Sequence, residues 1–269
     1  MHAFGVFNEY EKSQWHLFDI PWDELDPATV KPEIVNLVRS MLMGECNVIP
    51  AMHGFLNESV DDYDFATYVA NWGYQEVQHH FALKTWLTRV GADVSEDVVE
   101  AIRPPYPPGI THAATLATNI ISELSACHLY QKISTTVEEP VLRRIATLAS
   151  QDEARHAREF LFYTQRRLTR RPEELASVLE TVYVYIADPV KLVKHPVSVF
   201  KSELPQLKGH ETIDDGIAYY LSLDGDHLER LRRRVFSTFS TLTGFELENP
   251  ASIRRALRAV WDQHQSPTS

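Results

Sequence analysis

Apolar residues recur every three or four positions along most of this chain, which is the spacing of amphipathic α-helices. The longest such stretches cover residues 32–57, 61–90, 111–137 and 140–169. Shorter ones follow the second and the fourth of these, at 95–102, 173–186, 211–239 and 250–264. We therefore predict an all-α protein, and we expect Pro50 to kink the first long helix.

The four long stretches form two consecutive pairs, with the proline run 103–109 between them. Two helix pairs joined by one long crossover are the connectivity of a ferritin-like four-helix bundle. We predict this bundle over residues 30–170, after an irregular N-terminal arm (1–29) that lies over the body. Residues 171–269 are predicted to add further helices packed on the bundle within a single domain, with a loop at 191–205.

Composition and charge narrow the classes of function. The formal net charge of −11 argues against a nucleic-acid partner. The two cysteines, Cys46 and Cys127, form neither a disulfide framework nor a cysteine-based zinc site. Residues 1–11 lack the basic and apolar regions of a signal peptide, and no run of ~20 apolar residues predicts a membrane span. We expect a cytoplasmic protein with no membrane partner.

Two Glu-x-x-His motifs stand on the predicted long helices, Glu76-Val-Gln-His79 and Glu153-Ala-Arg-His156. A spacing of three residues places both side chains on one helix face, about one turn apart, so that one metal ion can bind both. A single such match is weak evidence, because glutamate and histidine are both common in this chain. The context of the two motifs carries the argument.

Each motif is preceded, one helix earlier, by a single glutamate on a largely apolar stretch. Glu45 lies 31 residues before Glu76, and Glu123 lies 30 residues before Glu153. The chain therefore repeats the order Glu, then Glu-x-x-His, twice. Two glutamates plus two Glu-x-x-His motifs on four helices are the ligand pattern of di-iron carboxylate bundles.

The surroundings of the six residues favour burial. Their helix faces carry apolar side chains, among them Met41, Leu42, Val48, Ile49 and Met52 near Glu45, and Leu116, Ile120, Ala126, Cys127 and Tyr130 near Glu123. The faces of the motif glutamates are similar, with Val69, Trp72 and Leu83 near Glu76 and Ala146, Ala149, Ala157 and Phe160 near Glu153. Isolated carboxylates in such a core cost many kcal/mol unless they are paired or metal-bound. Four carboxylates and two imidazoles match two divalent irons in charge and ligand type.

For any one of these residues, the competing interpretation is a metal-free bundle with solvated glutamates and satisfied core histidines. The register of all six favours a metal centre instead. Further acidic residues are interpreted as surface charges, namely Glu58, Glu138, Glu139 and Glu159. Further histidines are interpreted as packing groups, namely His80, His112 and His128, while His53, two turns after Glu45, is a further candidate for the site.

The segments Gln75-Glu-Val-Gln-His79 and Asp152-Glu-Ala-Arg-His156 resemble the paired metal motifs of the soluble acyl-[acyl-carrier-protein] desaturases. The likeness extends loosely over about residues 30–260 and includes three shorter segments, Glu138-Glu-Pro-Val-Leu142, Lys191-Leu-Val-Lys-His-Pro-Val197 and Leu242-Thr-Gly-Phe245.

The resemblance implies a homodimeric enzyme with two iron ions (Fe2+/Fe3+) and O2 as co-substrate. It implies electrons from a ferredoxin-like donor and an acyl chain, presented on acyl carrier protein, from which two hydrogens are removed. The catalytic metal ligands would be the single carboxylates Glu45 and Glu123 and the motif residues Glu76, His79, Glu153 and His156. Asp152 would lie behind a ligand histidine and fix its tautomer.

The chain also departs from that family. Gln75 stands where the better-known motif has an acid, so one charge behind the ligands is missing. Ala126, three residues after Glu123, replaces a threonine that the plant-type enzymes use in handling oxygen, and Ser122 or Ser125 is a candidate substitute. The spacing between ligand helices is shorter as well. Desaturation, hydroxylation and oxidation of another substrate therefore all stay open.

Several rival functions use similar ligands. An amine N-oxygenase of the arylamine type has a histidine where this chain has Ala149, and a ribonucleotide reductase radical subunit has a tyrosine where it has Leu83. A manganese catalase, an iron-storage bundle and a metal-free interaction bundle also stay open. Two basic clusters are candidate docking patches for an acidic carrier protein, namely Arg166, Arg167, Arg170 and Arg171, and Arg230, Arg232, Arg233 and Arg234. The alternative for the first is a solvated helix end, and the alternative for the second is pairing with Asp224, Asp226 and Glu229.

Overall fold

A computed structural model of the chain describes residues 1–92, 94–95, 109–187, 219, 222 and 226–265. The described residues form α-helices, short 3-10 helices and their connections, and no strand occurs among them. The prediction of an all-α protein is confirmed. In this part of the chain no helix is both long enough and apolar enough to cross a bilayer.

The chain divides into two compact units. Unit 1 comprises residues 1–107, 127–152 and 199–225, and unit 2 comprises residues 108–126, 153–198 and 226–269. Helices α6 (His112–Thr136) and α7 (Pro140–Arg170) each pass from one unit to the other without a break. Their bounds agree with the predicted stretches 111–137 and 140–169.

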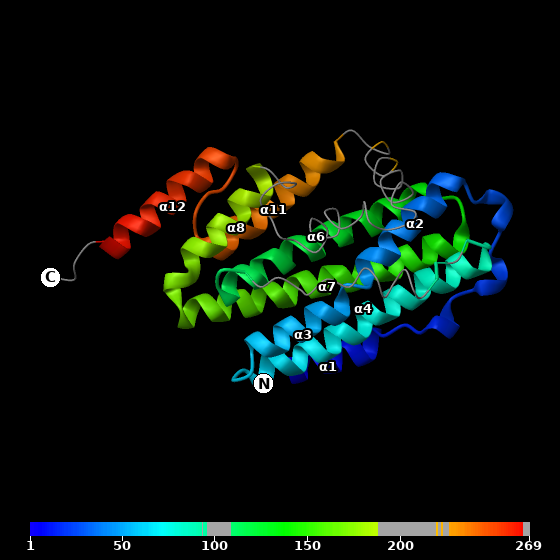
Figure 1. Cartoon of the computed structure of the whole chain (residues 1–269), viewed down its shortest axis with the longest axis horizontal. Coiled ribbons are helices and arrows are strands. Elements are labelled where there is room, and N and C mark those ends of the chain that lie inside the picture. Colours follow the sequence, from blue (N-terminus) through cyan, green and yellow to red (C-terminus); the bar gives the residue numbers. More distant parts are fainter. Residues whose placement is uncertain (93, 96–108, 188–218, 220–221, 223–225, 266–269) are drawn as a thin grey trace. The chain divides into compact units, whose positions relative to one another are not determined.

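Unit 1 is organised around α4 (Tyr63–Arg89), against which α1 (His2–Ser13), α2 (Pro32–Glu45) and α3 (Val48–Glu58) pack (Figure 1). Asp62 caps the start of α4 by accepting a hydrogen bond from the backbone N–H of Phe65. The helix ends just before Gly91, whose φ of +74° lies in the left-handed region that favours glycine. The predicted helix over 61–90 is thus confirmed.

The prediction of an irregular arm over residues 1–29 was wrong at its start, where α1 forms. Ala3, Val6 and Tyr10 are buried at helical spacing, and the Ala3 N–H donates to Asp64 Oδ1 over 3.1 Å. Three short 3-10 helices then follow, at Leu17–Asp19, Trp22–Glu24 and Pro27–Thr29. The apolar residues at helical spacing are present in the sequence before residue 11, whereas the prolines and tryptophans that indicate irregular structure begin only at residue 15.

Pro50 produces a break rather than a kink. Helix α2 ends at Glu45, Cys46 and Asn47 form a turn, and α3 begins at Val48, so that Pro50 lies in its first turn. Proline has no N–H to donate to the carbonyl four residues earlier, here that of Cys46, and its ring clashes with that carbonyl. The break leaves Glu45 as the last residue of α2.

Two glutamates that were predicted to be surface charges are buried. Glu139 is 1% exposed and precedes α7, where its carboxylate accepts hydrogen bonds from the backbone N–H groups of Val141 and Leu142 and from Trp86 Nε1. Glu159 is 3% exposed and forms a salt bridge with Arg158. Burial is tolerated because each carboxylate is hydrogen-bonded. Glu58 is half-buried, and Glu138 is exposed as predicted.

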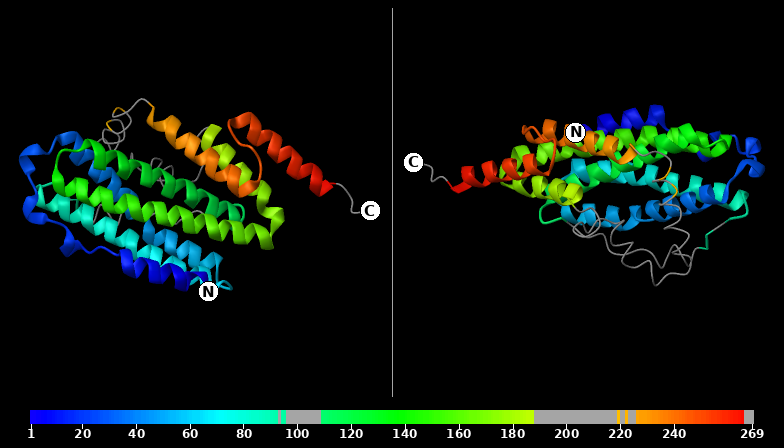
Figure 2. Two further views of the ribbon diagram at one scale, coloured as in Figure 1. Left: turned by 180° about the vertical axis from the view of Figure 1, so that it is seen from behind. Right: turned by 90° about the horizontal axis from the view of Figure 1, so that it is seen from above.

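In unit 2, α8 (Leu175–Ala187) packs against α11 (His227–Thr243) and α12 (Pro250–Gln265) (Figure 2). These helices confirm the predicted stretches 173–186 and 250–264. Helix α11 continues four residues beyond the predicted end at 239 and stops before Gly244, which has a φ of +73°. Most of the predicted helix 95–102, the proline run up to residue 108, the loop 191–205 and most of 211–225 lie outside the described residues.

Candidate metal centre

The first half of the candidate site lies in unit 1. Glu45 ends α2, while Glu76 and His79 lie one turn apart on α4. His79 is fully buried, and its Nδ1 is 3.9 Å from Glu76 Oε2. Glu76 is 7% exposed, and Glu45 is partly exposed. We call these three residues the unit 1 half-site.

Asp152 and Trp15 hold the imidazole of His79 from behind. Asp152 Oδ2 is 3.1 Å from His79 Nε2 and also accepts a hydrogen bond from Trp15 Nε1 over 2.7 Å. The Trp15 ring stacks on the imidazole, with 6.1 Å between centroids. Because a carboxylate accepts, Nε2 carries the proton, and Nδ1 is the nitrogen directed at the glutamates. Asp152 thus contacts a candidate ligand histidine in the way predicted for it.

The acidic surroundings shift two pKa values strongly. Burial alone lowers the pKa of His79, but the hydrogen bond to Asp152 and the charges of Glu76 and Glu45 outweigh it and raise that pKa to about 9. Burial, together with the charge of Glu76, raises the pKa of Glu45 to about 8, although His79 and a hydrogen bond from Tyr130 act in the opposite direction. In the metal-free chain, protons therefore compensate the crowded carboxylates near neutral pH.

The second half lies in unit 2 and has the same composition. Glu123 belongs to α6, and Glu153 and His156 lie one turn apart on α7. His156 Nδ1 is 3.5 Å from Glu123 Oε2 and 3.3 Å from Glu153 Oε2. All three side chains are at most 4% exposed. In this unit 2 half-site, as in unit 1, the imidazole presents Nδ1 to carboxylate oxygens.

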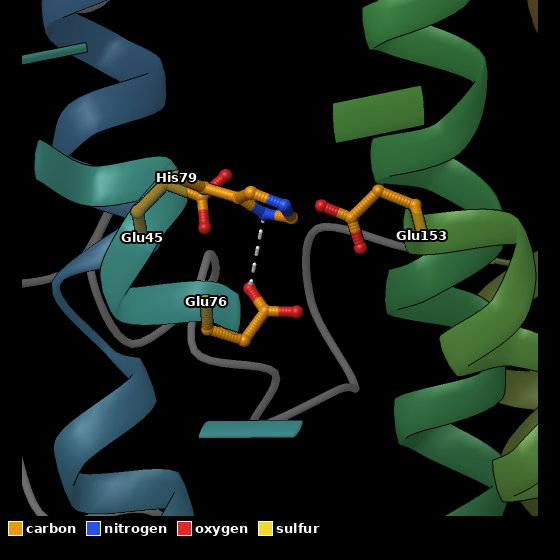
Figure 3. A group of neighbouring side chains, drawn as sticks. All are labelled: Glu45, Glu76, His79 and Glu153. Carbon is orange, nitrogen blue, oxygen red and sulfur yellow. Dashed lines mark ion pairs between the residues drawn. The ribbon is translucent and has the colours of Figure 1, made fainter. Parts of the chain in front are cut away.

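Each of the six predicted ligands belongs to a group of donor atoms that lie within 4.8 Å of one another. One group contains Glu45, Glu76, His79 and Glu153, the side chains drawn in Figure 3, where Glu76 and His79 project from α4. The other group contains Glu76, Glu123, Glu153 and His156. These buried Glu and His groups can hold a metal ion.

The other residues that the sequence suggested for the site have described contacts with groups outside the two half-sites. Gln75 is fully buried, and its side-chain amide donates to Gln14 Oε1 over 3.1 Å. Its place behind the metal ligands stays a prediction. His53 is exposed and contacts Asn57. Ser122 and Ser125 each donate to a backbone carbonyl one turn earlier in α6. Ser125 Oγ is also 3.2 Å from Tyr185 OH, and the role of either serine as a substitute stays a prediction.

Three residues that contact the half-sites were not predicted as part of them. Tyr130 OH donates to Glu45 Oε1, and Asn119 Nδ2 donates to Glu123 Oε1. Asn119 lies one turn before Glu123 on the same helix, which is a signal the sequence contains. Trp15 is 137 residues from Asp152, and no local pattern connects them.

No protein-family model matches this chain, and a search of curated proteins finds no match either.

Proposed function

We propose that this chain is an O2-activating, non-haem di-iron oxidoreductase with a ferritin-like bundle, similar to the acyl-[acyl-carrier-protein] desaturases. Its substrate would be an acyl chain, or a related carrier-bound or small molecule, oxidised at an unactivated C–H position. The observation that carries the proposal is the duplicated half-site, in which a single glutamate meets a Glu-x-x-His pair whose histidine presents Nδ1.

The donor set fits two divalent ions. Four ionised carboxylates carry a charge that two such ions neutralise, and the two neutral imidazoles complete a mixed oxygen and nitrogen set. Without compensation, burial of these carboxylates is costly. The raised pKa values of Glu45 and His79 support compensation by protons in the metal-free chain, and an incoming metal ion would displace them. No cysteine belongs to either donor group.

Bound iron would supply the redox chemistry with O2. The residues of this chain hold the metal ligands in place and keep water away from them. Asp152 and Trp15 fix the tautomer and the plane of His79, and the buried positions of His79 and His156 exclude solvent from their ring nitrogens. Such support preorganises the ligands before metal binds.

The rival reactions lack their distinguishing residues. Ala149 is fully buried and apolar at the position where an arylamine N-oxygenase has an additional histidine. Leu83 is likewise buried at the position of the radical tyrosine of a ribonucleotide reductase subunit. Both observations argue against these two rival reactions.

The proposed acyl carrier partner is acidic, and both basic clusters are candidate docking patches that also contain intramolecular ion pairs, such as Arg232 with Glu229 on α11. In the α7 cluster, Arg167 forms a salt bridge with Glu174 and Arg166 lies over the Tyr163 ring, so both have intramolecular roles. On α11, Arg230, Arg232 and Arg233 are exposed. A ferredoxin-like donor and a homodimer belong to the same proposal.

The test is elemental analysis of protein purified without added metal and again after anaerobic loading with ferrous iron. We expect about two irons per chain, as in other bundles with this ligand pattern. Glu153→Gln should remove bound iron, while Glu159→Gln, a buried control on the same helix, should retain it. Absence of metal from the loaded parent protein would refute the proposal. A loaded protein that consumes O2 with acyl carrier substrates should yield an alkene or an alcohol.

A further inference from the structure

In both half-sites the single glutamate is held at one oxygen by a neutral donor. Tyr130 OH donates to Glu45 Oε1, and Asn119 Nδ2 donates to Glu123 Oε1 over 3.1 Å. Tyr130 is 1% exposed and Asn119 is 5% exposed. Neither donor belongs to the motifs, yet each holds one oxygen of a single glutamate.

Both glutamates also belong to the donor groups of the candidate site. In unit 2, Glu123 Oε2 is 3.5 Å from His156 Nδ1, the ring nitrogen that also lies near Glu153. In unit 1, Glu45 supplies a carboxylate oxygen to the donor group that contains His79. In unit 2, Glu123 therefore has one oxygen near His156 while Asn119 holds the other, and in unit 1 Tyr130 holds a carboxylate that belongs to the donor group of His79.

Both donors come from α6. Asn119 lies four residues before Glu123, so the helix itself sets their separation. Tyr130 reaches the end of α2, and its ring also packs edge-on against His79, with 5.9 Å between centroids. The phenol thus contacts two members of the unit 1 half-site, and its position is fixed by packing as well as by its hydrogen bond.

We infer that Tyr130 and Asn119 are positioning residues that restrict Glu45 and Glu123 to coordination through a single oxygen. The inference rests on the proposed function, because it concerns ligands of that centre. A neutral hydrogen-bond donor holds one carboxylate oxygen in place and leaves the negative charge of the carboxylate available to the metal ion. When the donor is removed, the carboxylate can rotate and offer both oxygens to the ion, and the orientation that favours binding is lost.

Cobalt(II) provides the test, because its visible absorption weakens as its coordination number rises. The variants are Tyr130→Phe and Asn119→Leu in the full chain, each titrated anaerobically with Co2+ by calorimetry and absorption. Tyr163→Phe removes a buried phenol from α7, and Thr118→Val changes the residue beside Asn119, so these serve as matched controls. Each donor variant should weaken one of two binding steps by about 10- to 100-fold and lower the absorption of that ion, while the controls change neither.

The outcomes separate this inference from the proposed function. A parent protein that binds two Co2+ ions, with donor variants that match the controls in both affinity and spectrum, overturns the inference alone. A lower melting temperature with an unchanged cobalt spectrum indicates a merely structural role and overturns it too. A parent protein that binds neither cobalt nor iron removes the proposed function and the inference together. If Tyr130→Phe does not fold, the spectrum of Asn119→Leu decides.

Discussion

The two half-sites have the same ligands but different support. In unit 1, a phenol holds Glu45, and Asp152 and Trp15 hold His79. In unit 2, an amide from the same helix as Glu123 holds that glutamate. The ligand pattern is thus repeated along the chain while the residues behind it are not. Equal ligands with unequal support are expected to give metal positions of unequal affinity.

The largest effect should come from the glutamates that belong to both donor groups, Glu76 and Glu153. Replacing either with glutamine should abolish or greatly weaken binding of both ions. Glu45→Gln and Glu123→Gln should each leave about one ion, because each residue belongs to one group only. Iron per chain after anaerobic loading measures this. Equal losses in all four variants would contradict the division into two half-sites.

The next effect concerns Asp152. In Asp152→Asn the charge behind His79 is lost, and affinity for one ion should fall about 10- to 100-fold. The other ion, next to His156, should be affected much less. Calorimetric titration with Co2+ separates the two steps, and Glu138→Gln, an exposed change, is the control. A parallel decrease in both steps would show that the half-sites do not differ in this respect.

The pKa values in unit 1 predict how pH affects the metal-free protein. The pKa of His79 is raised to about 9, so its stabilising contribution is complete below the ordinary value of 6.5 and is lost as pH rises through 9. The pKa of Glu45 is raised to about 8, so between pH 4.5 and 8 the folded protein keeps a proton that the unfolded chain has lost. The free energy of unfolding therefore also falls as pH rises through this range. The melting temperature should therefore fall between about pH 6 and 9.

Metal should reverse that trend. Because bound metal replaces the protons on Glu45 and His79, the affinity of the protein for metal should rise over the same pH range. Melting curves with and without Co2+ at matched pH values measure the difference. A metal-free protein whose stability rises steadily to pH 9 would contradict the assignment of both protons.

The smallest effect should come from Trp15. In Trp15→Phe the stacking ring is retained, but the hydrogen bond to Asp152 is lost. A hydrogen bond of this kind contributes about 0.5–1.5 kcal/mol, so affinity for the unit 1 ion should fall only a few-fold. Trp22→Phe, which removes a donor to the Leu17 carbonyl, is the matched control. If Trp15→Phe and Trp22→Phe change the metal affinity equally, Trp15 contributes to the site through packing alone.

The grouping of the candidate ligands was predictable because their signals are local. The spacing of three within each motif, and a single glutamate one helix earlier, can be recognised without knowing the fold. Asn119 carries a similar local signal, one turn before Glu123. Tyr130 was recognised as a neighbour on the face of Glu123, but its contact with Glu45 depends on how helices distant in sequence pack.

The errors have the same physical origin. Glu139 was interpreted as a surface charge because it is charged and adjoins Glu138, yet its place just before Pro140, at the start of α7, makes it a buried cap. Trp15 contacts Asp152 from a segment that was predicted to be irregular. Side chains that support a site across long sequence separations leave no periodic trace, and so Trp15 and Tyr130 were harder to predict than Asp152, which adjoins the second motif.

The most direct test of the central claim is anomalous diffraction at the iron edge from crystals of the anaerobically loaded protein. We predict two iron peaks, one among Glu45, Glu76 and His79 and the other among Glu123, Glu153 and His156. A single peak, or peaks at other residues, would contradict the account of two half-sites that together hold two ions.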